Sequence, residues 1–339
     1  MVIVLVLGLL IVAVTIASTF ALDSTQLEQF QRAAYSREAN YLVARSAFEL
    51  GLTLLRVDES DVDSAEDIWA AGPQEMTWEG RDLRLEVEDE ERKFPINALV
   101  TAYDGDGAPP APSDEQQALN AALIRFLDKQ GVQGQSAGPA LVDWIDSDNL
   151  PVVGGSEVSN DPTVPVKNAP LDSFSELLYI RGWTPPLGAP PKPLLGGLSS
   201  AFAVEEEPEI DDGSTAANAQ TAVNGSQWSD WLSLHSQGKI NINTAPREIL
   251  LCLDEQMTDA LVEEIVRKRQ EGALSGEDDL REIAAIDEDL LFRLGRLIRY
   301  NSQYFRVRID VSAPPGPVHI QAVIQREDKD AKVVRWEVY

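Results

Sequence analysis

The sequence predicts an α+β fold, in which a long N-terminal helix packs on a small antiparallel sheet and a large, mostly α-helical insertion interrupts that sheet. Two observations predict this fold. Apolar residues recur at helical spacing through the first 56 residues. Apolar and charged residues alternate, as in half-buried strands, in residues 81–90 and again after residue 303. The roughly 200 residues between these strands have helical periodicity, so we assign them to the insertion.

The first element is a single long helix. Residues 1–22 contain no charged side chain, and about 20 apolar residues are enough for a helix to cross a bilayer. The apolar pattern then continues at spacings of three, four and seven, through Leu27, Phe30, Ala34, Tyr41, Phe48, Leu52 and Leu55. We therefore predict one helix from Met1 to about Arg56, roughly 80 Å long. Residues 1–22 are its transmembrane segment and residues 23–56 continue onto a soluble domain. The alternative is an ordinary single-pass anchor followed by a linker helix.

The remaining chain divides by its pattern. Residues 57–94 and 301–339 supply the two parts of the α/β domain, because strand alternation occurs in RDLRLEVEDE (81–90), YFRVRIDVS (304–312), VHIQAVIQRE (318–327) and KVVRWEVY (332–339). Residues 95–300 form the inserted helical domain. Within it, residues 95–183 are a first helical unit, residues 184–238 are a flexible loop rich in proline, glycine and acidic residues, and residues 239–300 are a second helical unit.

The second helical unit is similar to a known module. Residues 242–286 look like a helix-hairpin-helix, a family found in DNA-binding proteins. In those members a glycine-containing hairpin presents backbone N–H groups to phosphate, whereas here the turn is CLDEQMT (252–258), with two acidic residues and no glycine. We therefore expect this unit to bind protein. Because a K-x-x-I-N entry occurs at residues 93–97 and again at 239–243, we interpret the insertion as two SAM-like or helix-hairpin-helix-like units.

Composition restricts the function. The chain of 339 residues has 28 lysines and arginines against 56 aspartates and glutamates, a formal net charge of −28. This charge opposes contact with phosphate backbones, so nucleic acid is not an expected partner. Only His235 and His319 could act as general bases near neutral pH, and no nucleophile motif lies near either. We expect no enzymatic activity. A surface-anchored hydrolase with paired carboxylates is the alternative from that class.

The most specific local signal is a carboxylate pattern in residues 143–157, DWIDSDNLPVVGGSE. Asp146, Asp148 and Glu157 stand at positions 1, 3 and 12 of the spacing used by a 12-residue calcium loop, and carboxylate oxygens suit Ca²⁺. Leu150 and Pro151 occupy positions 5 and 6, where an EF-hand has a further oxygen ligand and a glycine. We therefore interpret the segment as an irregular calcium loop.

Two further residues belong to this hypothesis. Asn168 offers a carbonyl oxygen from a later turn. Asp143 lies one helical turn before Asp146 and is either a ligand or only a helix-end carboxylate. The alternative for the whole segment is an Asx-rich turn that closes a helix without a cation.

Together these features resemble the K-type minor pseudopilins of the bacterial type II secretion system. The resemblance covers nearly the whole chain and lies in MVIVLVLGLL (1–10), KFPINAL (93–99), LVDWIDSD (141–148) with GGSE and KNAPL downstream, and GKININTAPREIL (238–250). The final strand YFRVRIDV is also like the family. Most pseudopilins carry a glutamate at the fifth position. This chain has Leu5, a departure that the K-type members share.

The resemblance implies a processed subunit, with Met1 following the cleavage point of a prepilin peptidase. It implies a minor pseudopilin at the tip of the pseudopilus, which starts or caps the filament together with the I and J types for export of folded proteins across the outer membrane. The major pseudopilin and the inner-membrane secretion platform would be further partners. The protein would be a single-pass protein of the bacterial inner membrane with its C-terminal domain in the periplasm. Family members bind calcium in this domain, which carries over to Asp146, Asp148, Glu157 and Asn168.

A membrane-anchored helix-hairpin-helix protein of DNA binding or uptake is the alternative function. Retention of DNA at moderate salt would be expected of that protein and not of a tip subunit.

Overall fold

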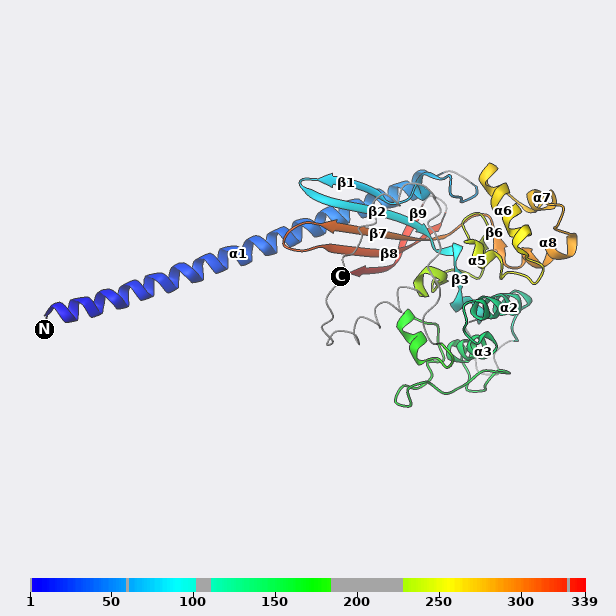
Figure 1. Ribbon diagram of the computed structural model, residues 1–339, viewed down its shortest axis with the longest axis horizontal. Coiled ribbons are helices and arrows are strands. Elements are labelled where there is room, and N and C mark those ends of the chain that lie inside the picture. The colour runs from blue at the N-terminus through cyan, green and yellow to red at the C-terminus, as the bar shows by residue number, and fades with distance from the viewer. Residues whose placement is uncertain (1, 59–60, 102–110, 184–227, 328–329) are drawn as a thin grey trace.

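The computed structural model describes residues 2–58, 61–101, 111–183, 228–327 and 330–339. For residues 2–13, 17 and 21–23 it describes the backbone alone. The long helix α1 (Val2–Val57) projects from a head in which an antiparallel sheet lies next to the helix and a helical part lies farther from the N-terminus (Figure 1). The predicted long helix and the mixed helix and sheet architecture are thereby confirmed.

The C-terminal part of α1 packs on the sheet. Its buried apolar side chains are Ala44, Ala47, Phe48, Leu52 and Leu55. Phe48 meets Trp336 edge to face, with ring centroids 4.8 Å apart. Helix and sheet approach closely at Gly51, because a Cβ atom there would lie 3.0 Å from a methyl group of Val307.

The predicted transmembrane segment, residues 1–22, falls largely on residues whose side chains the structure does not describe. Among the residues whose side chains are described, no helix is both long enough and apolar enough to traverse a bilayer.

The sheet has five strands in the order β1-β2-β7-β8-β9, and all neighbours are antiparallel. The strands are β1 (Gln74–Trp78), β2 (Arg81–Asp89), β7 (Tyr304–Ser312), β8 (Val318–Glu327) and β9 (Asp330–Val338). Alternate residues such as Leu83, Leu85 and Val87 point into the core beneath α1, as their period of two predicts. The insertion therefore leaves the sheet after β2 and returns at its neighbour β7.

Strand β1 is an addition to the prediction, since no strand is predicted before residue 81. Four of its five residues are exposed and only Met76 is half-buried. An edge strand of this kind carries no alternating apolar signal.

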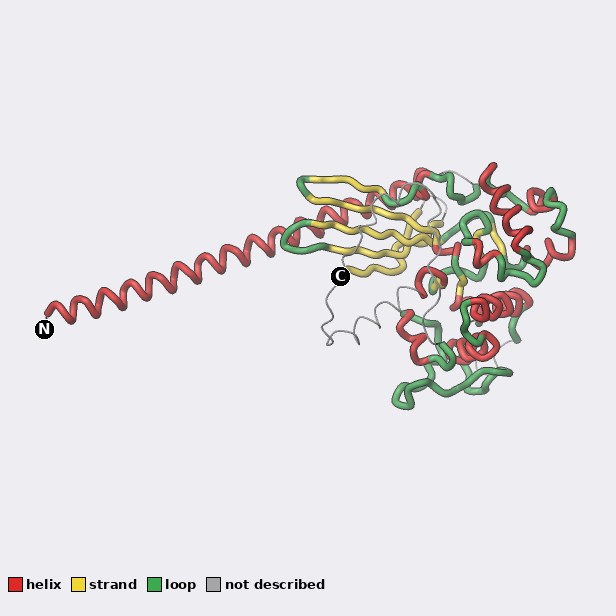
Figure 2. The backbone as a smooth tube through the Cα atoms, viewed as in Figure 1, coloured by secondary structure: helices red, strands yellow, loops and turns green. Residues whose placement is uncertain are grey.

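The helical part lies at the end of the head that is farthest from the N-terminus of α1 (Figure 2). Its helices are η3 (Ile96–Leu99), α2 (Asp114–Lys129), α3 (Gly134–Ile145), η4 (Phe174–Tyr179), α5 (Arg247–Leu250), α6 (Asp259–Glu271), α7 (Glu277–Arg281) and α8 (Glu288–Gly295). Two parallel pairs of two-residue strands accompany them, β3 (Phe94–Pro95) with β4 (Leu232–Ser233), and β5 (Ile240–Asn241) with β6 (Ile298–Arg299). A separate apolar core fills this part.

The predicted flexible loop, residues 184–238, is too long at its C-terminal end. Residues 184–227 lie outside the described residues, but residues 228–238 belong to the helical core. Trp228, Trp231 and Leu232 are 2%, 1% and 0% exposed, and β4 pairs with β3. Burial of two tryptophans outweighs the polar composition of the neighbouring sequence.

A buried polar cluster joins the sheet to the helical part. Asp89, at the end of β2, is fully buried, and its Oδ2 accepts hydrogen bonds from Thr244 Oγ1 (2.5 Å), Ser302 Oγ (2.7 Å) and Asn241 Nδ2 (3.1 Å). Its Oδ1 accepts the N–H of Glu91 at 2.7 Å. One carboxylate thus fixes groups from three separate segments, around Glu91, around residues 241–244 and at Ser302.

Two short helices flank the first two strands. Helix η1 (Ile68–Ala70) lies before β1, and helix η2 (Glu90–Arg92) lies directly after β2.

We predict that Asp89→Ala lowers the free energy of unfolding by about 3 kcal/mol, because it removes the acceptor of four buried hydrogen bonds. Urea denaturation of the full chain measures this change. Asp82→Ala, on the exposed part of the same strand, is the control and should change the value by less than about 0.5 kcal/mol. Equal small effects of both substitutions would contradict the role assigned to Asp89.

Candidate metal centre

The predicted cation ligands lie around the end of α3. Helix α3 ends at Ile145, and the backbone of Asp146 is extended (φ −73°, ψ 170°), although its N–H still donates to Val142 O. The chain then leaves the helix and returns as a loop. Carboxylate oxygens of Asp146, Asp148 and Glu157 all lie within 4.8 Å of one another. The structure therefore brings together the three carboxylates that stand at positions 1, 3 and 12.

Asn168 borders the same group. Its backbone has a positive φ of 50°, a conformation that asparagine adopts more readily than most residues. Its Nδ2 donates to Asp148 O at 2.6 Å and to Asn149 Oδ1 at 3.0 Å. Its Oδ1 is buried and has no hydrogen-bond partner in the described part of the chain. The side chain thus holds the loop with its nitrogen and leaves an oxygen available for a cation.

Asp143 lies beneath the loop and is fully buried. Its Oδ1 accepts the N–H of Val152 at 2.8 Å, while its Oδ2 has no partner among the described residues. Gly155 covers it so closely that a Cβ atom built on this glycine would lie 2.0 Å from Asp143 Oδ2. The GGSE segment therefore has a glycine where the loop must approach a carboxylate.

Five buried oxygens of this centre have no hydrogen-bond partner in the described part of the chain. They are Asp143 Oδ2, Asp146 Oδ1, both carboxylate oxygens of Glu157, and Asn168 Oδ1. Buried acceptors in proteins are nearly always satisfied, so a group of five requires an explanation. Oxygen donors from carboxylates and an amide form the ligand set that hard cations such as Ca²⁺ prefer. By this criterion the residues fit a bound cation.

The electrostatics agree with this fit. Burial, together with the charges of Asp148 and Asp143, raises the pKa of Asp146 to about 6. Burial, together with the charges of Asp143, Asp146 and Asp148, raises the pKa of Glu157 to about 7. Burial also raises the pKa of Asp143. Like charges that share a site without a counter-charge shift in this direction, and a divalent cation would reverse the shift.

The Asx turn offered as the alternative is also present, because Asp148 Oδ1 accepts the N–H of Leu150 at 2.7 Å. It involves only that one oxygen. The five unpartnered oxygens lie outside it and are left unexplained by a turn alone. Reasoning from spacing did not identify the role of Gly155, because a close approach between backbone and side chain has no linear motif.

A second carboxylate cluster, Asp58, Asp63 and Asp67, was not predicted. A side-chain cation already lies within it, since Arg326 Nη2 is 2.5 Å from Asp63 Oδ2 and Arg326 Nη1 is 3.1 Å from Asp58 Oδ2. This cluster is an ion-paired group that ties β8 to the segment after α1.

The fold and the site define a class of protein, an α+β head with a carboxylate centre in its helical part, carried on one long N-terminal helix. Models of the family "Type II secretion system (T2SS), protein K" match residues 92–195 and residues 240–293. The chain belongs to the type II secretion system protein K family.

Two known proteins are similar to it. "Type II secretion system protein K" of Klebsiella pneumoniae is 25% identical over 191 residues, which are 52% of this chain and 57% of that protein. The chain thus matches little more than half the length of this curated relative. A chain in the crystal structure of the GspK-GspI-GspJ complex from enterotoxigenic Escherichia coli superposes with a TM-score of 0.63 and 18% identity, covering 91% of this chain and 99% of that one. The likeness extends the shared fold over nearly the whole molecule.

We predict that Gly155→Ala weakens calcium binding at least about tenfold, a typical effect of disturbing the support of metal ligands. The new methyl group would displace Asp143 and the loop above it. Isothermal titration with Ca²⁺ measures the affinity. Gly272→Ala is the matched control, because a Cβ atom at Gly272 meets nothing within 4 Å. Equal calcium affinity in the two variants would contradict the geometry described for this loop.

We also predict that calcium affinity rises with pH between about 5 and 8 and then levels off. The cation-free centre holds protons up to the raised pKa values of Asp146 and Glu157, about 6 and 7, and Ca²⁺ must displace them. Below these values the dissociation constant should change by about tenfold per pH unit for each proton released. Titrations in buffers of different ionisation enthalpy count those protons. A constant affinity across this range would show that the centre does not bind through these carboxylates.

Proposed function

We propose that this chain is a minor pseudopilin of a type II secretion system, that it takes its place at the tip of the pseudopilus, and that it starts or caps the filament with other minor pseudopilins. The observation that carries the proposal is the combination of family membership with the architecture of the molecule. A single long helix extends from one end of the head, and the bulky helical part lies at the opposite end (Figure 1). A subunit of this shape has a helix for contact with neighbouring subunits. Its bulky head would hinder the stacking of another subunit on its distal side, which favours a position at the end of the filament.

The proposed partners are the I-type and J-type minor pseudopilins. The similar solved chain comes from a complex named for GspK, GspI and GspJ, and the likeness covers 91% of this chain. The major pseudopilin and the inner-membrane platform would be met by the N-terminal part of α1. The proposed location is the inner membrane, with the head in the periplasm.

The proposed cation is Ca²⁺, held by Asp146, Asp148, Glu157 and Asn168, with Asp143 beneath them. Its role would be structural, because it would neutralise the mutual repulsion of the carboxylates and fix the loop after α3. The protein's work is then binding and assembly, which require no catalytic residue.

The DNA-binding alternative is disfavoured by the surroundings of the hairpin. Arg125 from α2 donates to Cys252 O at 2.9 Å and to Leu253 O at 2.8 Å. The hairpin also contributes buried side chains to the core, among them Met257. Its backbone is thereby held against the first helical unit instead of facing a phosphate.

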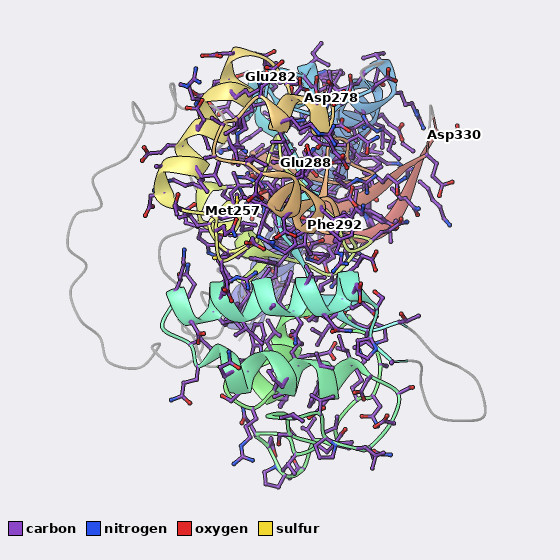
Figure 3. The ribbon with its side chains drawn as sticks, turned by 90° about the vertical axis from the view of Figure 1, so that its right-hand side faces the viewer. Met257, Asp278, Glu282, Glu288, Phe292 and Asp330 are labelled. Carbon is purple, nitrogen blue, oxygen red and sulfur yellow. The ribbon has the colours of Figure 1, made fainter. Side chains whose placement is uncertain are left out.

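The surface of the helical part at the end of the head farthest from the N-terminus also has the wrong charge for DNA. Figure 3 looks onto that end and shows Asp278, Glu282 and Glu288 there, on and beside α7 and α8. Acidic groups repel a phosphate backbone.

The test uses the full chain in detergent, mixed with full-length I-type and J-type subunits and analysed by light-scattering chromatography. We expect a discrete complex with one copy of each chain. A chain that elutes alone under all conditions, and that instead retains duplex DNA at moderate salt, would overturn the proposal in favour of the alternative.

The calcium part of the proposal is tested by thermal unfolding of the full chain in calcium and in chelator, for the wild type and for Asp146→Asn/Asp148→Asn. We expect chelator to lower the melting temperature of the wild-type chain by several degrees, because a ligand that binds only the folded state stabilises it. The variant should melt at the lower temperature in both buffers. A melting temperature that chelator leaves unchanged would argue against a cation at this centre.

A further inference from the structure

Strand β9 is an outer edge of the sheet. It pairs with β8 on one side, and no other strand in the described part of the chain lies on its other side. The N–H of Tyr339 donates to His319 O at 3.0 Å, and the N–H of His319 donates to Tyr339 O at 2.9 Å. Antiparallel ladders alternate between residues that bond inward and residues that bond outward. The backbone N–H and C=O groups of Trp336 and Val338 therefore point away from β8, toward the open side.

This edge is only partly protected. Natural edge strands carry charges, prolines or bulges that prevent pairing with another chain. The exposed residues of β9 include Val333, Val334 and Val338, and Tyr339 directly after the strand is exposed too. The two charged residues between them, Arg335 and Glu337, form an ion pair with each other, with Nη2 2.5 Å from Oε1. A register shift leaves Val334 without a partner in β8, so the segment beyond this bulge, residues 335–339, is the part available for pairing.

A groove runs beside the same segment. It has a volume of about 740 Å³ and lies where α1 leaves the sheet, between the helix, the turn that joins β7 to β8, and the end of β9. Its lining includes Phe30, Ala34, Tyr41, Pro317, Val338 and Tyr339. Phe30 and Tyr339 are 73% and 68% exposed. A chain lying along the edge would thus have an apolar groove for the side chains on one of its faces.

We propose that the free edge of β9 receives an extended segment of a pilin-like partner subunit, which adds to the sheet as a sixth strand and places side chains in the groove beside α1. The outward backbone groups of Trp336 and Val338 specify an extended segment, because only a β-strand offers donors and acceptors at their spacing. The groove specifies that alternate side chains of that segment are apolar.

The position of the groove specifies the partner. It continues the exposed side of α1, the helix that, under the proposed function, lies along neighbouring subunits, so this inference rests on that function. A subunit aligned with α1 brings its own head to this edge. A second copy of this chain is a poor occupant, because each copy carries a net charge of −28 and like charges oppose the contact.

The first test measures amide hydrogen exchange residue by residue, in the full chain alone and in its complex with the I-type and J-type subunits. We expect the amides of Trp336 and Val338 to exchange at least about tenfold more slowly in the complex, because a new strand would satisfy them. The amide of Tyr339, already bonded to β8, is the internal control and should be slow in both states. If the complex forms and both outward amides exchange as fast as before, the inference is overturned while the proposed function stands. If no complex forms with the wild-type chain, the proposed function fails and the inference fails with it.

The second test uses Val338→Pro, which removes an outward N–H that β8 does not use. Proline is tolerated at such edge positions. Val338→Ala is the matched control, because it keeps the N–H and removes most of the side chain. We expect the proline variant to bind the partner subunits at least tenfold more weakly than the alanine variant. Equal affinities of the two variants would show that the backbone edge is not paired in the complex.

Discussion

The hydrogen bonds of Asp89 hold the two parts of the head in their relative positions. The sheet and the helical part have separate apolar cores, so hydrophobic burial alone does not fix one against the other. Asp89 accepts bonds from Asn241, Thr244 and Ser302. Burial raises the pKa of Asp89, and the hydrogen bonds from Thr244 and Ser302 oppose that rise. Because each of these groups is costly to leave unpaired in the interior, the cluster permits one arrangement of the two parts.

Charged groups reinforce the same junction. Lys93 is fully buried, with its Nζ 3.0 Å from Glu90 Oε1 and 3.1 Å from Glu88 Oε2. Arg306 Nη2 lies 2.5 Å from Glu90 Oε1. Burial alone would raise the pKa of Glu90, but the charges of Arg306 and Lys93 outweigh it and hold the pKa below its ordinary value. Such buried ion pairs add little net stability. Any other packing of the sheet against the helical part would, however, leave a buried charge unpaired. Their contribution is to the uniqueness of the arrangement.

The sequence predicted those elements whose signal is local. The alternation in residues 81–90 and 304–312 matches β2 and β7. Ser113 with Gln116 forms a capping box at the start of α2, which is likewise a signal within four residues of sequence. Two features were not predictable in this way. Strand β1 has too few buried residues to alternate. Trp228 and Trp231 are buried by segments far away in sequence.

In the metal centre, too, the sequence predicted what depends on local spacing and not what depends on how the chain folds back on itself. The spacing of Asp146, Asp148 and Glu157 was enough to group the carboxylates, because they belong to one short loop. The contact of Gly155 with Asp143 depends on how tightly that loop folds back onto α3, and the spacing of residues carries no such information.

The two chain connections between the sheet and the helical part leave adjacent strands at the same end. Strand β2 ends at Asp89 and β7 begins at Tyr304, with Asp89 opposite Phe305. A force that pulls the helical part along the strand direction would draw β2 and β7 together against β1 and β8. Ladder hydrogen bonds run perpendicular to the strands, so this load is applied in shear and all the bonds of a pair resist it at once. The topology thus makes the head resistant to tension along its own length.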